Sequence, residues 1–185
     1  PLEPLVRLSF EDDAHLAGLA QLANNSLALG GRGWAELPPQ SEWDPDHALT
    51  LALWVKMDSL DGMPVLICKG AWQQSGYFLQ IYNKQVRFYL AGVDTLDAGR
   101  VKVGKWQHIA ATFGFNQMRI YINGEQVGRK RVTGRPRPSA TPLLIGRYGA
   151  GDEVYFVRGL MDDIRIYLVP LTPSEVHELY KQTVH

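Results

Sequence analysis

The stretch GLMDDIRIYLVPLTPSEV, which runs from Gly159 to Val176, carries more fold information than any other part of the chain. Apolar and polar residues alternate along its first half, a pattern that predicts a β-strand with one buried face. Asp162 and Asp163 are neighbours in this strand, and neighbouring side chains on a strand point to opposite faces. The two carboxylates are therefore not expected to form a catalytic pair, and we expect Asp163 to lie at the surface.

A helix is predicted directly after this strand. Thr172 fits the N-cap, Pro173 fits the first helical position, and Glu175 follows three residues after Thr172, as in a capping box. We expect this helix to end near Thr183. Residues Asp12–Asn25 are a second helix candidate, because their apolar residues recur at a spacing compatible with a helix.

Short strand patterns separated by turn signals dominate the rest of the chain. Residues Leu49–Met57 alternate with one apolar face, and Asn123-Gly124 is the dipeptide most typical of a tight β-hairpin. Asn83-Lys84 predicts a second tight turn. Strands recur about every 8–12 residues, a spacing that indicates an antiparallel sandwich or barrel.

Composition excludes several classes of protein. The chain has 185 residues, of which 45% are apolar, so it suits one domain with a full hydrophobic core. Lys and Arg number 19, as do Asp and Glu, and the net charge of +0 gives no general attraction to nucleic acid or to an anionic membrane. No apolar run approaches the roughly 20 residues that span a membrane. The single Cys68 has no second cysteine with which to form an internal disulfide.

Three segments resemble, in order, the laminin-G-like, concanavalin A-type jelly-roll domains, and above all the bacterial branch found in carbohydrate-active and surface proteins. LTLALWVK (49–56) resembles the family's strand with a Trp near its end. WQHIAATFGFNQMRIYINGEQVG (106–128) resembles its Trp-x-His hairpin, which closes on Tyr-x-Asn-Gly. Gly159–Val176 resembles its C-terminal strand and short helix. The match covers about Trp34 to Tyr180.

This resemblance implies an all-β fold, an antiparallel two-sheet jelly-roll sandwich with a short C-terminal helix, in which residues 1–185 form a single domain. Two facing sheets would bury one face of every strand, which agrees with the alternating pattern. The same fold hosts glucanases, lectins, sugar-binding modules and adhesion modules, so the fold alone does not fix the function.

A catalytic site is not predicted. Glucanases of this fold resemble one another in a Glu-x-Asp-x-x-Glu strand, whose alternation places three acids on one face. The segment EWDPDH has Glu42 and Asp44, but His47 replaces the last Glu and Pro45 would interrupt a central strand. The sequence also lacks a Gly-x-Ser-x-Gly motif and any zinc-binding spacing of His and Cys.

The resemblance implies one structural calcium ion at the rim of the sandwich. Members of the family often bind it with an acid from the first-strand region and with the Asp-Asp segment, and calcium prefers six to eight oxygen ligands. Glu11 and Asp162 occupy the corresponding positions here. The alternative is that Asp162 caps a turn or pairs with an arginine.

A glycan-binding surface is predicted at two loops. Sugar rings stack their C–H faces on exposed aromatic side chains, and their hydroxyls bind planar polar groups. Trp72 lies in the loop GAWQQSGY, where no core is evident for it, and RYGAGDEVYF offers further aromatic and polar groups. The candidate ligand-binding residues are Trp72, Tyr77, Arg147, Tyr148, Asp152 and Tyr155. The alternative is that these loop aromatics pack on the rim of the sandwich.

A basic segment, GRKRVTGRPRP, forms a second candidate surface. It contains Arg129, Lys130, Arg131, Arg135 and Arg137. Laminin-G-like domains of animals bind sulfated glycans through such patches, while basic residues also protect an exposed edge strand from pairing with another chain.

The sequence as a whole predicts a non-catalytic carbohydrate-binding module, extracellular or at the cell surface. The chain opens on Pro1 with no signal peptide, so we expect it to be tethered to other domains of a longer protein. A structural or adhesion module that binds protein or an anionic glycan is the alternative. A glycoside-active enzyme is a third possibility.

Overall fold

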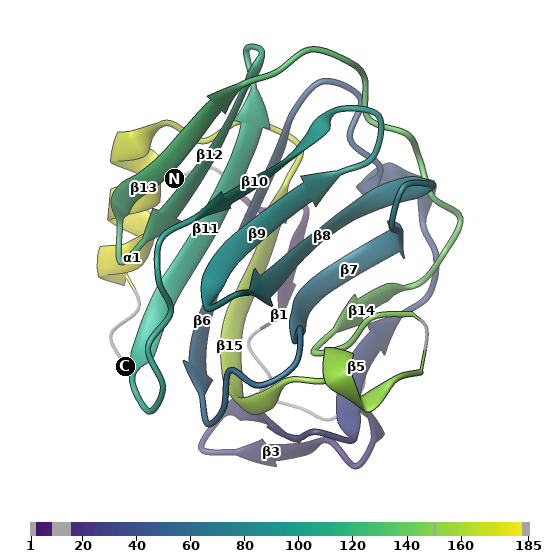
Figure 1. Ribbon diagram of the computed structural model, residues 1–185, viewed down its shortest axis with the longest axis vertical. Helices are drawn as coiled ribbons and strands as arrows, with labels where there is room; N and C mark the ends of the chain where they lie inside the picture. The colour runs from purple at the N-terminus through teal and green to yellow at the C-terminus, as the bar shows by residue number, and fades with distance from the viewer. Residues whose placement is uncertain (1–2, 9–15, 150, 183–185) are drawn as a thin grey trace.

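Two antiparallel sheets pack face to face in the computed structural model, which describes residues 3–8, 16–149 and 151–182 (Figure 1). The front sheet, which faces the viewer in Figure 1, has the order β10-β9-β8-β7-β14-β5-β2. The back sheet has the order β13-β12-β11-β6-β15-β4-β3, with β1 also paired to β15. This arrangement confirms the predicted two-sheet antiparallel sandwich.

The strands are short to medium in length. The front sheet comprises β2 (Leu16–Gly18), β5 (Gly33–Leu37), β7 (Val65–Ala71), β8 (Ser75–Tyr82), β9 (Gln85–Leu90), β10 (Asp94–Ala98) and β14 (Leu143–Ile145). The back sheet comprises β1 (Val6–Leu8), β3 (Gln21–Ala23), β4 (Ser26–Gly30), β6 (Leu49–Met57), β11 (Trp106–Gly114), β12 (Gln117–Ile122), β13 (Glu125–Arg131) and β15 (Arg158–Tyr167). The helical elements are the 3-10 turns η1 (Ser41–Trp43) and η2 (Glu153–Tyr155) and the helix α1 (Pro173–Gln182).

The main core lies between the sheets, because alternate residues of each strand point inward. On β6, Leu49, Leu51 and Leu53 are fully buried in this core. A smaller cluster on the outer face of the back sheet contains Val176 and Leu179 of α1, so the helix covers that face. A third cluster lies on the outer face of the front sheet, away from α1, and Tyr155 of η2 packs against it (Figure 1).

The predicted tight turns are present. Asn123 and Gly124 have φ of 52° and 78° between β12 and β13, and Asn83 and Lys84 have φ of 50° and 64° between β8 and β9. Two consecutive residues with positive φ match the twist of the flanking strands in a two-residue hairpin.

The C-terminal helix is also confirmed. The Thr172 backbone N–H donates to the Glu175 carboxylate at 2.7 Å, and the Glu175 N–H donates back to the Thr172 hydroxyl at 3.3 Å, which is the predicted capping box. The helix predicted over Asp12–Asn25 is wrong within the described residues, because β2 and β3 lie there. Gly18 has φ of 62°, and long-range pairing of β2 with β5 overrides the local periodicity.

Asp163 is buried, which corrects the prediction that it lies at the surface. The register between β15 and β6 shifts between Asp162 and Arg165, and Asp163 has φ of 44°, so a β-bulge interrupts the alternation. The Asp163 carboxylate accepts hydrogen bonds from Arg165 at 2.6 and 2.9 Å and from Arg7 at 3.1 Å. The segment that carries the two aspartates therefore joins β1 to β15 through an ion-pair cluster.

No helix among the described residues is long and apolar enough to cross a membrane.

Candidate functional site

The outer face of the front sheet carries a row of side chains that crosses five strands. Cross-strand pairing joins Tyr89 of β9 to Phe78 of β8, Phe78 to Cys68 of β7, Cys68 to Leu144 of β14, and Leu144 to Glu36 of β5. The first four belong to the cluster on this face, so the row is aromatic at one end and ends on a carboxylate at the other. Two loops rise above it.

The first loop joins β7 to β8 and carries Trp72. The Gln74 N–H bonds to the Ala71 carbonyl, and Gln73 has φ of 61°, so the loop is a tight turn with Trp72 at its second position. At its base, a Cβ on Gly70 would lie 2.2 Å from the Ser75 carbonyl oxygen, so only glycine allows this close approach.

Tyrosine hydroxyls hold the Trp72 turn in place. The Trp72 N–H donates to the Tyr148 hydroxyl at 2.8 Å, and the Gln73 N–H donates to the Tyr89 hydroxyl at 2.7 Å. The Trp72 ring lies 4.6 Å from the Tyr89 ring and 5.9 Å from the Phe78 ring, between centroids. Even so, 41% of Trp72 stays exposed, which presents an indole face to solvent in a fixed position.

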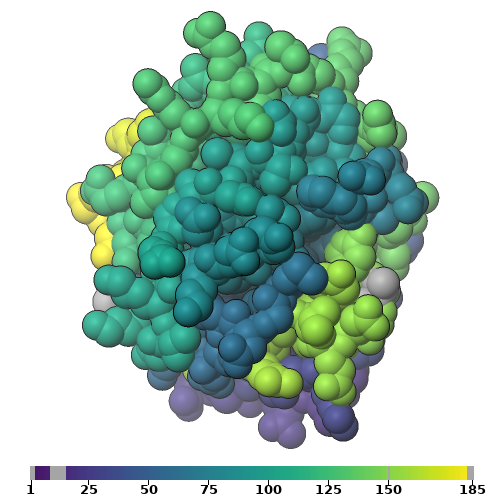
Figure 2. Space-filling model, in the orientation of Figure 1, coloured from purple at the N-terminus to yellow at the C-terminus, as the bar shows by residue number. Residues whose placement is uncertain are grey.

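The second loop follows β14 and closes the other side of a cavity of about 240 Å³. Tyr148 and Tyr155 come from this loop, with ring centroids 5.2 Å apart, and both are half-buried. Figure 2 looks onto this face, where the surface is hollowed between the blue Trp72 segment and the lime-green segment that contains η2. The described residues that line the cavity, called here the aromatic cavity, are Met63, Val65, Trp72, Phe78, Gln80, Arg87, Tyr148 and Tyr155.

A second and more polar cavity, of about 530 Å³, adjoins the aromatic cavity, and Tyr148 lines both. Glu36, Gln74 and Arg147 contribute its polar groups, and Cys68 forms part of its floor. Burial raises the pKa of the Cys68 thiol to about 12, so this sulfur stays protonated and is a poor nucleophile at neutral pH.

The sequence-predicted ligand residues divide into three groups. Trp72, Tyr148 and Tyr155 lie together around the aromatic cavity. Arg147 lines the neighbouring cavity, with its guanidinium 4.2 Å from the centroid of the Trp34 ring. Asp152 is exposed at the start of η2 and lines neither cavity.

The prediction that Tyr77 contacts a ligand is wrong. Its side chain is fully buried between the sheets, and its hydroxyl donates to the Trp43 carbonyl at 3.3 Å. Burial raises the pKa of the Tyr77 phenol, so it stays a neutral donor inside the core. The next residue, Phe78, points outward instead and forms part of the cavity.

Sequence reasoning missed Phe78, Gln80 and Arg87. Gln80 is buried and donates from its side-chain nitrogen to the Met63 carbonyl at 2.9 Å. Alternation along β8 places Phe78 and Gln80 on one face, so the polar Gln80 was the signal that could have identified this face as the outer one.

The glucanase-like segment forms no strand of acids. Glu42 belongs to η1, and Asp44 accepts a hydrogen bond of 2.6 Å from the ammonium of Lys69, which is fully buried. Ser139 also donates its backbone N–H to Asp44, at 3.1 Å. Asp44 therefore pairs with the buried Lys69 and links its own loop to the loop that contains Ser139, and it does not form a row of acids on one face.

The calcium prediction is not tested by the described residues. Glu11 lies outside them, and the Asp162 carboxylate accepts the Asp163 N–H at 2.7 Å. Among residues 3–8, 16–149 and 151–182, no group of three His, Cys, Asp or Glu side chains could hold a metal ion. A calcium site at Asp162 would thus need ligands from other groups, and it stays a prediction.

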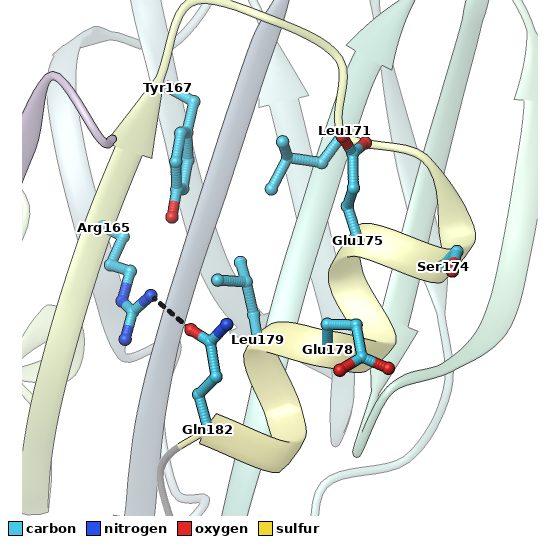
Figure 3. Close-up of a pocket in the computed structure, with 8 residues that line it drawn as sticks. All are labelled: Arg165, Tyr167, Leu171, Ser174, Glu175, Glu178, Leu179 and Gln182. Carbon is cyan, nitrogen blue, oxygen red and sulfur yellow. Dashed lines mark hydrogen bonds between the residues drawn. The ribbon is translucent and has the colours of Figure 1, made fainter. Parts of the chain in front are cut away.

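A further cavity of about 350 Å³ lies between α1 and β15 (Figure 3). Glu175 and Glu178 border it from the helix, and Arg165 and Tyr167 from the strand. Arg165 pairs with Asp163 and donates to Gln182 at 3.4 Å, the bond drawn in Figure 3. Its one aromatic ring among the described residues is buried, so this cavity offers no exposed stacking surface.

The two facing sheets with their covering helix define a jelly-roll β-sandwich of lectin-like architecture. A family model described as the concanavalin A-like lectin/glucanases superfamily matches residues 29–177, so the chain belongs to this superfamily. It is 29% identical over 145 residues to human usherin and 24% identical over 176 residues to mouse pappalysin-1. These matches cover 72% and 83% of the chain but only 3% and 11% of the two relatives, so the chain corresponds to a small part of each.

Solved structures show the same fold at low sequence identity. Domain 4 of AbnA, an extracellular arabinanase of Geobacillus stearothermophilus solved with arabinotriose, aligns with a TM-score of 0.70 and 19% identity, over 89% of this chain and 82% of that one. A botulinum neurotoxin type C structure, from a study of cell entry through two ganglioside molecules, aligns with a TM-score of 0.77 and 14% identity, over 98% of this chain and 51% of that one.

Proposed function

We propose that this chain is a non-catalytic carbohydrate-binding domain whose aromatic cavity contacts the sugar. The observation that carries the proposal is the convergence of Trp72, Tyr148 and Tyr155, from two loops far apart in sequence, around one open cavity. Aromatic rings present apolar faces to the C–H groups of a sugar ring, and the tyrosine hydroxyls bind its hydroxyl groups. Because hydrogen bonds fix the Trp72 turn before any ligand arrives, little ordering entropy would oppose binding.

A binding role fits this cavity better than glycoside hydrolysis. Hydrolysis generally requires two carboxyl groups on either side of the scissile bond. No described residue that lines the aromatic cavity is an Asp or Glu, and Glu36 of the adjoining cavity accepts the Trp34 indole N–H at 2.9 Å.

The structural neighbours supply a reason to favour glycans and an extracellular location. One is a domain of an extracellular arabinanase in complex with arabinotriose, and another belongs to a neurotoxin whose entry depends on gangliosides. We infer by analogy that this domain acts outside the cell, tethered to other domains of a longer protein.

A glycan array tests the proposal. Three proteins are compared: wild type, Trp72→Ala and Phe115→Ala. Phe115 is 84% exposed on the β11–β12 hairpin of the back sheet, so its removal controls for the general loss of an exposed aromatic. We expect wild type and Phe115→Ala to retain the same glycans and Trp72→Ala to bind them about fivefold or more weakly, since one stacked ring contributes on the order of 1 kcal/mol or more. Equal retention by all three would remove the aromatic cavity from the binding site.

An adhesion role through the basic segment is a second candidate, favoured by one observation. Arg119 of β12 lies directly opposite Arg129 of β13, and no carboxylate of the described residues pairs with either. Lys130 differs, because it pairs with Asp94 of β10 at 2.6 Å and joins the edges of the two sheets. An anionic partner would relieve the repulsion between the two arginines. This candidate would be favoured if Arg129→Gln no longer binds the anionic partner while Trp72→Ala binds it as well as wild type does.

A further inference from the structure

The aromatic cavity has a distinctive charge pattern. Arg87 is the only charged side chain among the described residues that line it, and no carboxylate faces the space. Neutral sugars are commonly bound by carboxylates and amides that accept hydrogen bonds from pairs of hydroxyl groups. Here the lining offers one charged donor, the guanidinium of Arg87, beside neutral groups that both donate and accept: the hydroxyls of Tyr148 and Tyr155 and the amide of Gln80.

Arg87 is held so that one edge of its guanidinium stays available. Its Nε and Nη2 donate to the two carboxylate oxygens of Asp97, each at 2.7 Å, and Asp97 lies directly opposite on β10. Arginine has a planar fork of N–H donors, and no acceptor among the described residues binds Nη1. The hydrogen bonds to Asp97 raise the pKa of Arg87 above its usual range, so the group stays charged at any physiological pH.

Aromatic rings fix the same guanidinium from the sides. It lies 3.7 Å from the centroid of the Tyr82 ring and 5.8 Å from that of Trp72. Only 17% of the Arg87 side chain is exposed, so its charge is less screened than that of a surface arginine. Asp97 does not line the cavity, so the positive end of this pair is the end that faces a ligand.

We propose that the aromatic cavity selects a glycan residue that bears a carboxylate, with the Nη1 side of Arg87 binding the acid while Trp72 stacks on the ring. A carboxylate complements the positive charge of Arg87, which no carboxylate of the described cavity lining opposes, and it matches the planar fork of arginine better than separate hydroxyls do. This inference rests on the proposed function, since it names the class of sugar for the same cavity. Uronic acids and sialic acids share the required chemistry.

Binding of paired acidic and neutral sugars tests the inference. The probes are trigalacturonate, its neutral methyl ester, sialyllactose and lactose, and dissociation constants are measured by calorimetry with wild-type protein. We expect at least one acidic probe to bind about tenfold or more tightly than its neutral counterpart, because a charge-assisted hydrogen bond is about twice as strong as a neutral one. The pair that shows this difference identifies the source of the carboxylate.

Three variants assign the preference to its residue. Arg87→Gln should bring the acidic and neutral probes to equal affinity, and Arg87→Lys, which keeps the charge but loses the fork, should give an intermediate ratio. Arg100→Gln removes an exposed arginine that lines neither cavity of the front sheet and should leave the ratio unchanged. Trp72→Ala should weaken acidic and neutral probes together. Thermal melts of each variant establish that it is folded before its affinities are compared.

The outcomes separate the two proposals. Equal affinity of wild type for acidic and neutral probes, with both lost in Trp72→Ala, would overturn the acid preference and leave the glycan site standing. An acid preference that Arg100→Gln removes as fully as Arg87→Gln would also overturn it, because the cause would then be long-range attraction. Failure of wild type to bind any acidic probe contradicts the inference, while the glycan array still decides the proposed function.

Discussion

The backbone N–H of Trp72 donates a hydrogen bond of 2.8 Å to the Tyr148 hydroxyl across 76 residues of sequence. This bond joins the two loops that form the rim of the aromatic cavity, and Tyr148 also lines the polar cavity on its other side. The position of the exposed indole therefore depends on a residue of the other loop.

Replacement of Tyr148 by Phe should weaken glycan binding. The loss in binding free energy should exceed the loss in the free energy of unfolding. The ring remains, but the Trp72 N–H loses its acceptor, and a net hydrogen bond contributes about 1 kcal/mol. Tyr155→Phe is the matched control, because no hydrogen bond to the Tyr155 hydroxyl is found within the part of the chain that the structure describes. Urea unfolding and glycan titration of both variants would check this. A larger loss of affinity in Tyr155→Phe than in Tyr148→Phe would contradict the assigned role of the bond.

Asp163→Asn should destabilise the fold strongly. The Asp163 side chain is 7% exposed and that of its partner Arg165 is 10% exposed, so the substitution leaves a buried cation without its carboxylate. Removal of one partner of such a pair costs about 3 kcal/mol or more. Asn tolerates the positive φ of this position, so the backbone is not the cause of the loss. Asp46→Asn, at a 76% exposed side chain, should change the free energy of unfolding by less than about 0.5 kcal/mol. Similar losses in both variants would argue against the buried cluster.

Because of His108, the free energy of unfolding should decrease as pH is lowered through the mildly acidic range. Burial lowers its pKa from 6.5 to about 4, so between these values the unfolded chain binds a proton that the folded chain does not. The contribution of His108 to the free energy of unfolding is fully present above pH 6.5. It is lost as pH falls toward 4, which lowers the free energy of unfolding by up to about 3 kcal/mol. Urea unfolding at about pH 7.5 and about pH 5 would measure this decrease. His108→Gln should show a smaller decrease than wild type, and an equal decrease would contradict the assignment.

Calcium at Asp162 and Glu11 would raise the thermal midpoint, because an ion that binds only the folded state stabilises it by mass action. Melts in millimolar calcium and in chelator measure the effect, and Asp162→Asn should abolish it. An unchanged midpoint in wild type would count heavily against a tight site.

Alternation and turn chemistry were sufficient to predict an antiparallel sandwich or barrel, since Asn123-Gly124 and the capping box at Thr172 act within a few residues of sequence. The resemblance to the jelly-roll family was needed to predict two facing sheets. The wrong predictions of local structure concern segments whose conformation is decided by contacts with residues distant in sequence. Alternation could not reveal the bulge at Asp163, whose conformation depends on the ion pairs with Arg7 and Arg165. The strands β2 and β3 replace a periodic helix pattern because they pair with β5 and β4.

The candidate site was predicted only in part, because local sequence identifies its loop residues but not the strand residues that the fold brings to them. Trp72, Tyr148 and Tyr155 lie in loops, where an aromatic residue without an evident core is a usable signal. Tyr77 and Phe78 are both aromatic, so residue type alone does not say which of them faces outward, and the distinguishing signal was the polar Gln80, two residues after Phe78 on the same face. Arg87 was invisible as a site residue, because only the fold brings β9 beside the Trp72 turn.

We expect glycan to contact the outer face of the front sheet, and chemical-shift mapping by NMR can locate this contact. A glycan retained on the array is titrated into labelled protein, and signals are followed on both outer faces. We expect the indole signal of Trp72 and the signals of Tyr148 and Arg87 to shift together, while those of Arg129 and Tyr167 stay unchanged. Shifts confined to Arg129 and its neighbours, or to the cavity beside α1, with none at Trp72, would contradict glycan binding at the aromatic cavity.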